Sequence, residues 1–404
     1  MRKILGAVMG VFLLLGCVGM QAQARFVHQD GKQLVDGTGK PLLMRGINLG
    51  NWLVNEGYMF RLEDGPQSAR EIEALFNELI GPVEAAKFWK EYREQYITER
   101  DIQRIKRLGF NSVRIPLHYK FFTPGNEEGF ALLDRVVEWS GKAGIYVIFD
   151  LHCAPGGQTG ANIDDSWGYP WLYESPEEQE ATIAIWKRVA GHYKSNPTVI
   201  GYDMLNEPIP HFPALAKYKP MLEPLEKRIA KGIREVDPNH VIIATGAVWD
   251  TDFSILGPPF DKNMMYTFHK YWMPPVQAQI QQYVDFREKY NVPIWIGETG
   301  ENKDDWIAQF VPLLEKNNIG WTFWPYKKMD QTSCPVTFDR PPYWDEIVAY
   351  AKLPGNTGAM EKKLPQRPSL EHSREAMAGL LKNIRYENTR VNEGYIKALG
   401  LGGK

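Results

Sequence analysis

The stretch ERDIQRIKRLGFNSVRIP, residues 99–116, joins a helical pattern directly to a short apolar run. Ile102, Ile105 and Leu108 recur at helical spacing, which predicts one apolar helix face over residues 99–108. Residues 112–116 follow as a short run rich in β-branched side chains, which is typical of a strand buried on both faces. This unit predicts a helix packed on the outside of a parallel sheet.

The same alternation continues on both sides of this unit. Together with residues 112–116, the predicted strands are residues 43–48, 146–151, 199–205, 241–245, 265–268, 293–297 and 320–324. Further helical patterns cover residues 130–142, 177–193 and 221–235. Eight strand candidates joined by right-handed crossovers predict a closed (β/α)8 barrel, in the α/β class.

Both ends of the barrel region carry additional segments. The turn signals at residues 30–32 and 36–39 lie between short apolar runs and predict an N-terminal β-hairpin. Residues 369–383 are expected to form a helix of the barrel shell. No linker-like composition divides the chain before residue 353, so residues 25–404 are expected to form one TIM-barrel domain.

The first 24 residues have the pattern of a signal peptide. A basic pair, Arg2-Lys3, precedes the apolar run 4–15 and the small-residue cleavage pattern at 22–24. The alternative is a lipoprotein signal, Leu14-Leu-Gly-Cys17, with a lipid on Cys17. Cleavage near residue 24 is favoured because the folded pattern begins almost at once after it. We therefore expect a secreted, periplasmic or cell-surface protein.

Composition narrows the functional classes. A formal net charge of −2 gives no reason to expect a nucleic acid or another polyanion as partner. The 13 Trp, 19 Tyr and 18 Phe fill the core in part, and they also suit the apolar faces of sugar rings. Cys153 and Cys334 do not make a disulfide framework, although they could pair, and their spacing matches no zinc pattern.

Polar and aromatic residues stand at the C-terminal ends of the predicted strands, where barrels of this kind carry their chemistry. In chain order they are Asn48, Arg114, His152, Asn206, Glu207, His269, Tyr271, Glu298 and Trp324. Each of them alone could be a helix cap, an ion-pair partner or a core residue. Their joint occurrence is not needed by a purely structural barrel, so it predicts a binding or reaction site.

Two carboxylates on different strands suit the hydrolysis of a glycosidic bond. Glu298 is the candidate nucleophile, because Arg114 can keep it ionised and Tyr271 can donate a further hydrogen bond to it. Glu207 is the candidate acid and base, because the charge of Glu298 raises its pKa until the glycosyl-enzyme forms. Asn206 is placed to hold the sugar 2-hydroxyl.

At these residues the sequence resembles glycoside hydrolase family five, over residues 26–352. The motifs that carry the resemblance are Arg45–Trp52, Gly109–Pro116, Asp150–His152, Leu205–Pro208, His269–Tyr271, Gly297–Gly300 and Trp321–Trp324. The resemblance implies catalytic glutamates on the fourth and seventh strands and a sugar platform at Trp324.

Within that family, Trp52-Leu-Val-Asn-Glu56 and residues 151–158 are similar to fungal exo-β-1,3-glucanases. This similarity implies that Glu56 helps to hold the terminal sugar; the alternatives are a solvated loop residue or an ion pair with Arg61. The sequence departs from that branch at Asn51, at the two residues that flank Glu56, and in the loop 159–173, so the linkage stays open.

These observations predict a retaining β-glycoside hydrolase that acts on a β-glucan or β-glucoside by double displacement, and the branch resemblance favours exo action. One alternative is an endo-acting β-glucanase or β-mannanase of the same family. Another is a non-catalytic carbohydrate-binding barrel, which the presence of both glutamates disfavours. The expected partner is an oligo- or polysaccharide, with no cofactor, metal, nucleic acid or membrane span, and the chain is expected to be a monomer.

Overall fold

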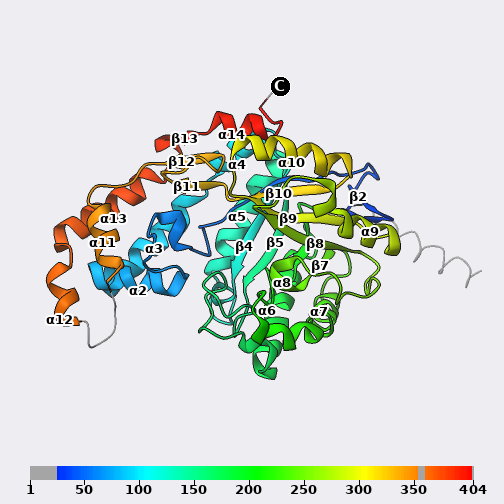
Figure 1. Ribbon diagram of the computed structural model, residues 1–404, viewed down its shortest axis with the longest axis horizontal. Coiled ribbons are helices and arrows are strands. Elements are labelled where there is room, and N and C mark those ends of the chain that lie inside the picture. Colours follow the sequence, from blue (N-terminus) through cyan, green and yellow to red (C-terminus); the bar gives the residue numbers. More distant parts are fainter. Residues whose placement is uncertain (1–24, 354–359, 403–404) are drawn as a thin grey trace, which may run out of the picture.

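The computed structural model describes residues 25–353 and 360–402. Eight parallel strands form a closed barrel in the order predicted from the sequence (Figure 1). They are β3 (Arg45–Asn48), β4 (Ser112–His118), β5 (Tyr146–Cys153), β6 (Val199–Asp203), β7 (Val241–Thr245), β8 (Met264–Tyr271), β9 (Ile294–Gly300) and β10 (Gly320–Trp324). The (β/α)8 fold class is therefore confirmed, whereas the predicted signal peptide and Cys17 lie outside the described residues.

Helices cover the outside of the barrel. They are α4 (Glu99–Leu108), α5 (Glu128–Ala143), α6 (Pro176–Tyr193), α7 (Lys219–Arg234), α9 (Gln281–Tyr290) and α10 (Asp304–Lys316). The short segment α8 (Ala247–Asp250) follows β7 at the mouth of the barrel instead, and its backbone departs from helical geometry at Val248 and Trp249. In α4, the Thr98 and Asp101 side chains form a capping box at the start, and Gly109 ends the helix with a φ of 104°. Ile102 and Ile105 are fully buried against the barrel, as their spacing predicts.

The register of the strands brings the site residues to one level. Asn48 of β3 lies opposite Arg114 of β4, and His269 of β8 lies opposite Glu298 of β9. Because all the strands are parallel, their C-terminal ends meet at the same mouth of the barrel. In each of these two pairs, side chains that are separate in the sequence are therefore neighbours because their backbones pair.

The predicted N-terminal hairpin is present and lies at the other end of the barrel. Strand β1 (His28–Asp30) pairs antiparallel with β2 (Gln33–Val35). Val27 and Leu34 pack with a separate cluster of buried side chains from the first residues of the strands, including Met265 and Trp295. The hairpin thus covers the N-terminal strand ends, away from the mouth.

A helical lobe stands beside the barrel (Figure 1). It begins with α2 (Ala69–Ile80) and α3 (Pro82–Tyr96), which the sequence analysis did not identify, and it includes α11 (Trp344–Ala351) and α12 (Met360–Lys363). Helix α13 (Leu370–Asn383) packs on α2 and α3. The expectation that residues 369–383 belong to the barrel shell is therefore wrong.

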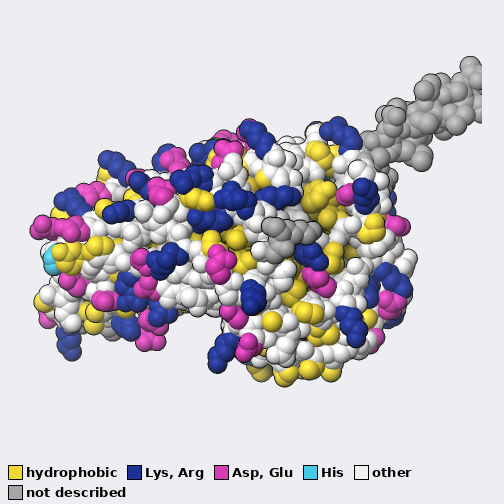
Figure 2. Space-filling model, turned by 90° about the horizontal axis from the view of Figure 1, so that it is seen from above, with side chains coloured by type: hydrophobic (Ala, Val, Ile, Leu, Met, Phe, Trp, Pro, Cys, Tyr) yellow, Lys and Arg dark blue, Asp and Glu magenta, His cyan; other side chains and the backbone are white. Residues whose placement is uncertain are grey.

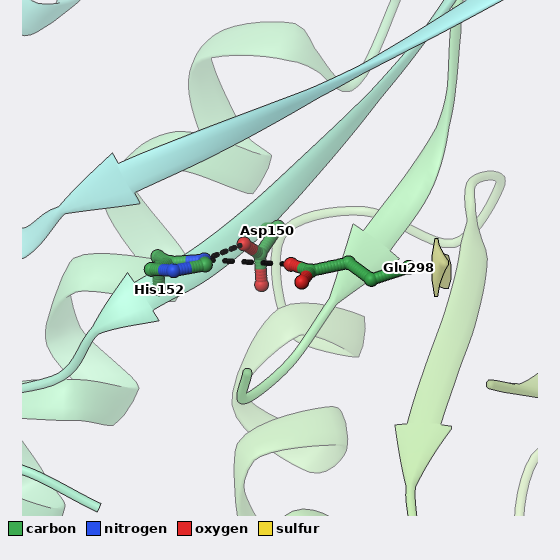
Figure 3. A group of neighbouring side chains, drawn as sticks. All are labelled: Asp150, His152 and Glu298. Carbon is green, nitrogen blue, oxygen red and sulfur yellow. Dashed lines mark hydrogen bonds and ion pairs between the residues drawn. The ribbon is translucent and has the colours of Figure 1, made fainter. Parts of the chain in front are cut away.

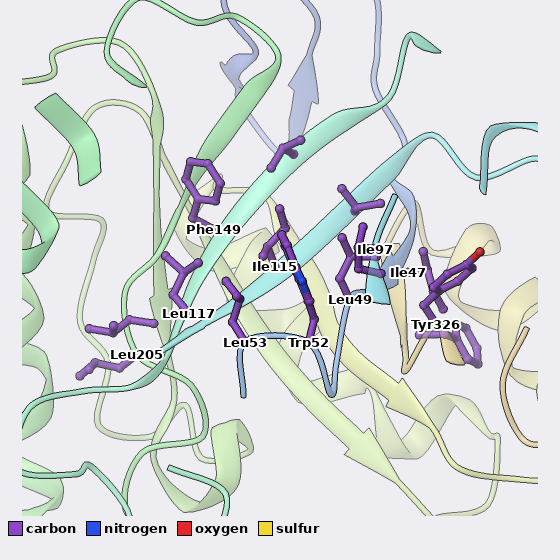
Figure 4. Packing of buried hydrophobic residues seen from close by; sticks show 14 of the residues in the cluster. Ile47, Leu49, Trp52, Leu53, Ile97, Ile115, Leu117, Phe149, Leu205 and Tyr326 are labelled. Carbon is purple, nitrogen blue, oxygen red and sulfur yellow. The ribbon is translucent and has the colours of Figure 1, made fainter. Parts of the chain in front are cut away.

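The physical reason is the apolar face of α13. Ala376, Met377 and Leu380 are buried there, and α2 and α3 already offer it a surface rich in aromatic rings, such as Phe76 and Trp89. One buried cluster runs from this lobe into the barrel. Trp52 and Leu53, which follow β3, lie in it beside Ile115 and Leu117 of β4 (Figure 4).

The C-terminal part of the chain adds a small sheet next to the mouth. It consists of β11 (Lys327–Met329), β12 (Val336–Phe338) and β13 (Thr389–Val391), and the helix α14 (Glu393–Ala398) then packs on α10. Cys153 and Cys334 are both buried free thiols, so they do not form the disulfide that the sequence left open.

Charged side chains are mixed over the surface. On the face drawn in Figure 2, Lys and Arg are interspersed with Asp and Glu, and no broad patch of one sign stands out. Arg374 pairs with Glu84, and Arg228 pairs with Glu180, in ion pairs of this kind. Among the described residues, no helix has both the length and the apolar composition that crossing a membrane requires.

Candidate active site

A pocket of about 640 Å³ opens at the C-terminal ends of the strands. The predicted residues Glu56, His152, Asn206, Glu207, His269, Tyr271, Glu298 and Trp324 all line it. The predicted residues Asn48 and Arg114 lie beneath it and are fully buried. The structure thus brings all ten predicted site residues to one end of the barrel.

We call Asn48, Arg114, Asp150, Asp203 and Glu298 the pocket floor. Arg114 is its centre: Nε donates to Asp203 at 2.8 Å, and Nη1 donates to Glu298 at 2.5 Å. Nη2 lies 3.0 Å from an oxygen of Asp150. Asn48 accepts from Arg114 and donates to the carbonyls of residues 297 and 323, so its whole side chain is engaged within the protein. The floor is therefore rigid before any substrate binds.

Glu207 and Glu298 sit in different electrostatic surroundings. Burial raises the pKa of Glu298, and the charge of Arg114 opposes that rise. Burial raises the pKa of Glu207 well above its usual range, and the negative charge of Glu298 raises it further. Tyr271 donates to Glu298 at 3.1 Å, whereas the side-chain partner of Glu207 is the His269 ring, whose Nδ1 lies at 2.9 Å. These surroundings suit one carboxylate and one carboxylic acid.

The backbone that carries Glu207 is strained. Glu207 and Ile209 have φ values of 45° and 56°, in the left-handed region that non-glycine residues rarely adopt. Gln158 holds this loop in two ways. Its side-chain amide donates to the carbonyls of His152 and Asn206, and its backbone carbonyl accepts from the N–H of Ile209. Such strain persists where surrounding contacts over-determine it, and it aims Glu207 into the pocket.

His152 links the floor to the wall of the pocket. Its Nδ1 lies 2.8 Å from Asp150 and 3.9 Å from Glu298, and the three side chains converge in Figure 3. Its ring stacks on Trp324 with the planes 6° apart and the centroids at 5.4 Å. Asn206 donates toward Nε2 at 3.4 Å and accepts from Arg114 at 2.9 Å. Through these contacts, Asp150 and Asn206 fix the His152 ring, and the ring supports the Trp324 indole beside the two glutamates.

Trp324 is also held from its other side. Its indole N–H donates to the Tyr58 hydroxyl at 2.7 Å, and Tyr58 donates to Glu301 at 3.1 Å. The Lys328 ammonium, which is buried in the small sheet, pairs with Glu301 at 2.6 Å. A side chain at Gly50 would come within 2.7 Å of the Trp324 ring, so the glycine in the first strand motif gives the indole its room.

Glu56 lines the pocket with 7% of its surface exposed. Among the described residues, its carboxyl group has no hydrogen-bond or ion-pair partner. Arg61 lies 3.5 Å from Glu63 instead, so neither the solvated loop nor the pair with Arg61 describes Glu56. Burial, with the charges of Glu298 and Glu301 nearby, raises the pKa of Glu56 to about 8.

Other lining residues escaped the sequence analysis, including Tyr58, Glu301, Trp249 and Trp272. We call Glu56, Trp249 and Trp272 the pocket rim. Trp272 directly follows the His269–Tyr271 motif and is 75% exposed, so an aromatic residue at a strand end could have indicated it. Glu301 directly follows β9, so its position at a strand end could have indicated it in the same way. Tyr58 lies in a 3-10 helix, Gly57–Phe60, in the connection after β3, where the strand-end rule does not apply.

Two groups in the described part of the chain bring three possible metal ligands together: Asp150, His152 and Glu298, and Glu207, His269 and Glu298. In the first, the Arg114 guanidinium already contacts both carboxylates. In the second, Glu298 is again the partner of Arg114, and His269 contacts Glu207. The Arg114 guanidinium thus already supplies a positive charge to the carboxylates of the pocket floor.

A closed parallel barrel with two carboxyl groups at its mouth, an arginine on one of them and an indole wall defines a glycoside hydrolase. The chain belongs to glycoside hydrolase family 5, because the family model for cellulases of that family matches residues 77–330. The resemblance inferred from the motifs is therefore confirmed, and so is the enzyme class.

Curated relatives carry several activities in their names. A β-xylosidase of Phanerodontia chrysosporium is 27% identical over 75% of this chain and 71% of its own. Endoglucanase C of Acetivibrio thermocellus is 26% identical over 65% of this chain and 92% of its own. A probable glucan 1,3-β-glucosidase A of Aspergillus niger is 31% identical over 42% of each chain.

Among solved structures, a β-glucanase of Saccharophagus degradans in complex with cellotetraose superposes with a TM-score of 0.55. It is 18% identical, and the match covers 85% of this chain and 94% of that one. At this identity the likeness supports the barrel fold alone.

Proposed function

We propose that this enzyme hydrolyses a β-glucan or β-glucoside with retention of configuration, with Glu298 as nucleophile and Glu207 as acid and base. One observation carries the proposal. A carboxylate oxygen of Glu207 and one of Glu298 lie within 4.8 Å of each other. Retaining enzymes hold their carboxyl groups about 5–5.5 Å apart, whereas inverting enzymes leave about 6.5–9.5 Å for a water molecule.

The first step forms a covalent intermediate. Glu298 attacks the anomeric carbon while Glu207 gives its proton to the glycosidic oxygen, and the bond between that carbon and oxygen breaks. Arg114 and Tyr271 hold the Glu298 carboxylate in place for the attack. Asn206 is placed to donate to the sugar 2-hydroxyl, a contact that strengthens in the transition state.

The second step releases the sugar. Glu298 is now an ester and has lost its negative charge, so the pKa of Glu207 falls and its carboxylate can take a proton from water. The hydroxyl attacks the anomeric carbon and the ester bond to Glu298 breaks. A 2-deoxy-2-fluoro-β-glucoside with a good leaving group should trap the intermediate, and peptide mass spectrometry should find the label on Glu298. Labelling of another residue would contradict the proposal.

We also propose exo action, which rests on the surroundings of Glu56. Glu56, Tyr58 and Trp324 lie on the side of the pocket formed after β3 and β10, and the Glu56 carboxyl is free to bind neighbouring hydroxyls of a terminal sugar. A chain that continued past this point would bury Glu56 without partners, which is unfavourable. The names of the β-xylosidase and glucan 1,3-β-glucosidase relatives are consistent with this mode.

The endo-acting β-glucanase is the second candidate, and the endoglucanase relative favours it. An oligomer labelled at its reducing end separates the two. Exo action releases unlabelled monosaccharide first and shortens the chain stepwise. Internal fragments of mixed length as the earliest products would replace the exo proposal by the endo one. A panel of laminarin, cello-oligomers, mixed-linkage glucan and mannan then identifies the linkage.

Three further expectations remain proposals. Residues 1–24 direct export, with lipidation at Cys17 as the alternative outcome. Residues 25–404 act as one domain, and the enzyme works as a monomer on an oligo- or polysaccharide. Mass spectrometry of the N-terminus of the exported protein, together with its sedimentation velocity, tests these statements.

A further inference from the structure

A second carboxyl group lies behind the histidine that contacts Glu207. Asp250 is fully buried at the end of α8, and its Oδ1 accepts from the backbone N–H of Gly246 at 2.6 Å. Its Oδ2 lies 3.5 Å from Nε2 of His269. The other ring nitrogen, Nδ1, lies 2.9 Å from Glu207. The three side chains therefore form a row, Asp250–His269–Glu207, that ends at the candidate acid.

Oδ2 of Asp250 and Nε2 of His269 face each other. Within the described residues, neither Oδ2 of Asp250 nor Nε2 of His269 has a hydrogen-bond partner, and both atoms are buried. An unpaired buried polar atom is energetically unfavourable, so two such atoms that face each other need a functional explanation. A side chain at Gly297 would come within 3.0 Å of that same Nε2, so the glycine before Glu298 leaves room for the ring.

The backbone around Asp250 is strained. Val248, Trp249 and Asp250 have φ values of 59°, 56° and 60°, three left-handed non-glycine residues in succession. Such residues are energetically unfavourable, and they cluster at functional sites. The N–H of Val248 donates to the carbonyl of Ile209 at 2.8 Å, which ties this turn to the strained loop of Glu207. The turn places Trp249 in the pocket and Asp250 beneath His269.

The charges around the row determine where its protons reside. Asp203 of β6, Glu226 of α7 and Glu207 all face Asp250; burial and these negative charges raise its pKa well above the usual range. Burial and the positive charge of Arg114 lower the pKa of His269 well below the usual range. In its neutral form, Asp250 can point its O–H toward Nε2 of a neutral imidazole across the 3.5 Å that separates the two atoms. The ring then carries its own hydrogen on Nδ1 and donates it to Glu207.

We propose that Asp250 is a positioning residue that acts through His269 to present an N–H donor to Glu207. The inference rests on the proposed role of Glu207 as acid and base. When Glu207 gives its proton to the glycosidic oxygen, it becomes a carboxylate in a buried site. The Nδ1–H of His269 then stabilises that carboxylate, and Asp250 keeps the ring from turning or changing its tautomer.

Two substitutions of Asp250 separate this role from a structural one. In D250N the amide still accepts from Gly246 and donates to Nε2, so we expect losses within about threefold on all substrates. D250L has a similar volume and no donor. It should lower kcat by about 10- to 100-fold on substrates with poor leaving groups, and by less than about threefold on activated aryl glycosides that need no acid.

The matched control is Asp237, which pairs with His240 at 2.5 Å in a buried site remote from the pocket. D237L should lower the melting temperature without changing the dependence of kcat on the leaving group. In the E207Q background, D250L should add nothing to the leaving-group dependence. An equal loss on activated and poor substrates in D250L, or no loss, overturns the inference.

Nitrogen-15 NMR of histidine-labelled protein provides a readout besides activity, and it applies to D250N if D250L does not fold. The His269 signals should show hydrogen on Nδ1 in the unmodified chain and in D250N. Hydrogen on Nε2 in the unmodified chain overturns the inference. The failure of the proposed function looks different: E207Q itself would then keep the leaving-group dependence of the unmodified enzyme.

Discussion

The carboxyl groups of the pocket floor and the carboxyl group of the pocket rim differ in how many partners the protein gives them. On the floor, Arg114 contacts Glu298, Asp150 and Asp203 directly, and every one of these groups comes from a barrel strand. On the rim, Glu56 has no partner among the described residues, and Trp272 is largely exposed. We infer that the side chains of the floor are held in place before a substrate binds, whereas the Glu56 carboxyl group on the rim is available to the hydroxyls of a bound sugar.

The largest expected effect comes from the floor. Glu298→Ala removes the proposed nucleophile and should lower kcat by about 10⁴-fold or more, because the proposed covalent route is lost. The fold should persist, since Arg114 keeps Asp150 and Asp203 as partners. Azide should restore part of the rate and give a product of inverted configuration. Glu288→Ala, at the surface, is the control. Near-normal turnover in Glu298→Ala would refute the assignment of Glu298.

The next effect concerns the acid. As the proposed acid, Glu207 has to carry a proton at the start of the reaction, and the upward shift of its pKa favours that protonated form. Activity should therefore decline as the pH rises through this pKa and as the pH falls through that of Glu298. Glu207→Gln should remove the alkaline limb for activated aryl glycosides, which need little acid help. An unchanged alkaline limb in a kcat/KM profile would show that another group is the acid.

A smaller effect is expected on the rim. Glu56→Ala should raise KM by about 10- to 100-fold for oligomers and weaken the preference for chain ends, with a smaller change in kcat. Because the pKa of Glu56 is about 8, the group is neutral in the empty pocket at neutral pH. Glu56→Gln should therefore retain more affinity than the alanine variant. Identical product patterns in all three proteins would remove Glu56 from the account.

The smallest effect concerns stability. Glu226 is buried beneath the site, and burial raises its pKa to about 8, although it accepts from the N–H and hydroxyl of Thr245. Its raised pKa favours folding below the ordinary pKa of 4.5, and this stability is lost as the pH rises toward about 8. Glu226→Gln should reduce the fall in melting temperature between about pH 5 and pH 8 by a few degrees, on the order of 2–4 °C per kcal/mol. Parallel curves for both proteins would contradict this.

The same contrast explains what the sequence could predict. Three residues of the floor, Asn48, Arg114 and Glu298, follow from strand ends, because parallel pairing places Asn48 beside Arg114 and Glu298 beside His269 once the eight strands are recognised. Asp203, which also lies on the floor, was not among the predicted site residues. A local pattern is enough for that step. It is also enough for the helix that carries Ile102 and Ile105, whose bounds, residues 99–108, agree with the structure.

The contacts that hold Trp324 and the position of the lobe required information that no local pattern contains. Tyr58 reaches Trp324 because Glu301 and the buried Lys328 hold its hydroxyl, and these groups come from loops and a small sheet far apart in the sequence. Helix α13 could be recognised as a helix, but its place on α2 and α3 depends on tertiary packing. Asp250 follows β7, at whose end no site residue was predicted. It reaches His269 only because three successive residues adopt left-handed backbone angles, which the sequence pattern does not predict.

The central claim is that Glu207 and Glu298 act by double displacement. Proton NMR of the first products from a β-glucoside or β-glucan oligomer tests it most directly, because the anomeric signals appear before mutarotation. With double displacement, the β-anomer forms first and the α-anomer grows in later. If the α-anomer appears first, the two carboxyl groups work by inversion, and the assignment of Glu298 as a nucleophile is wrong.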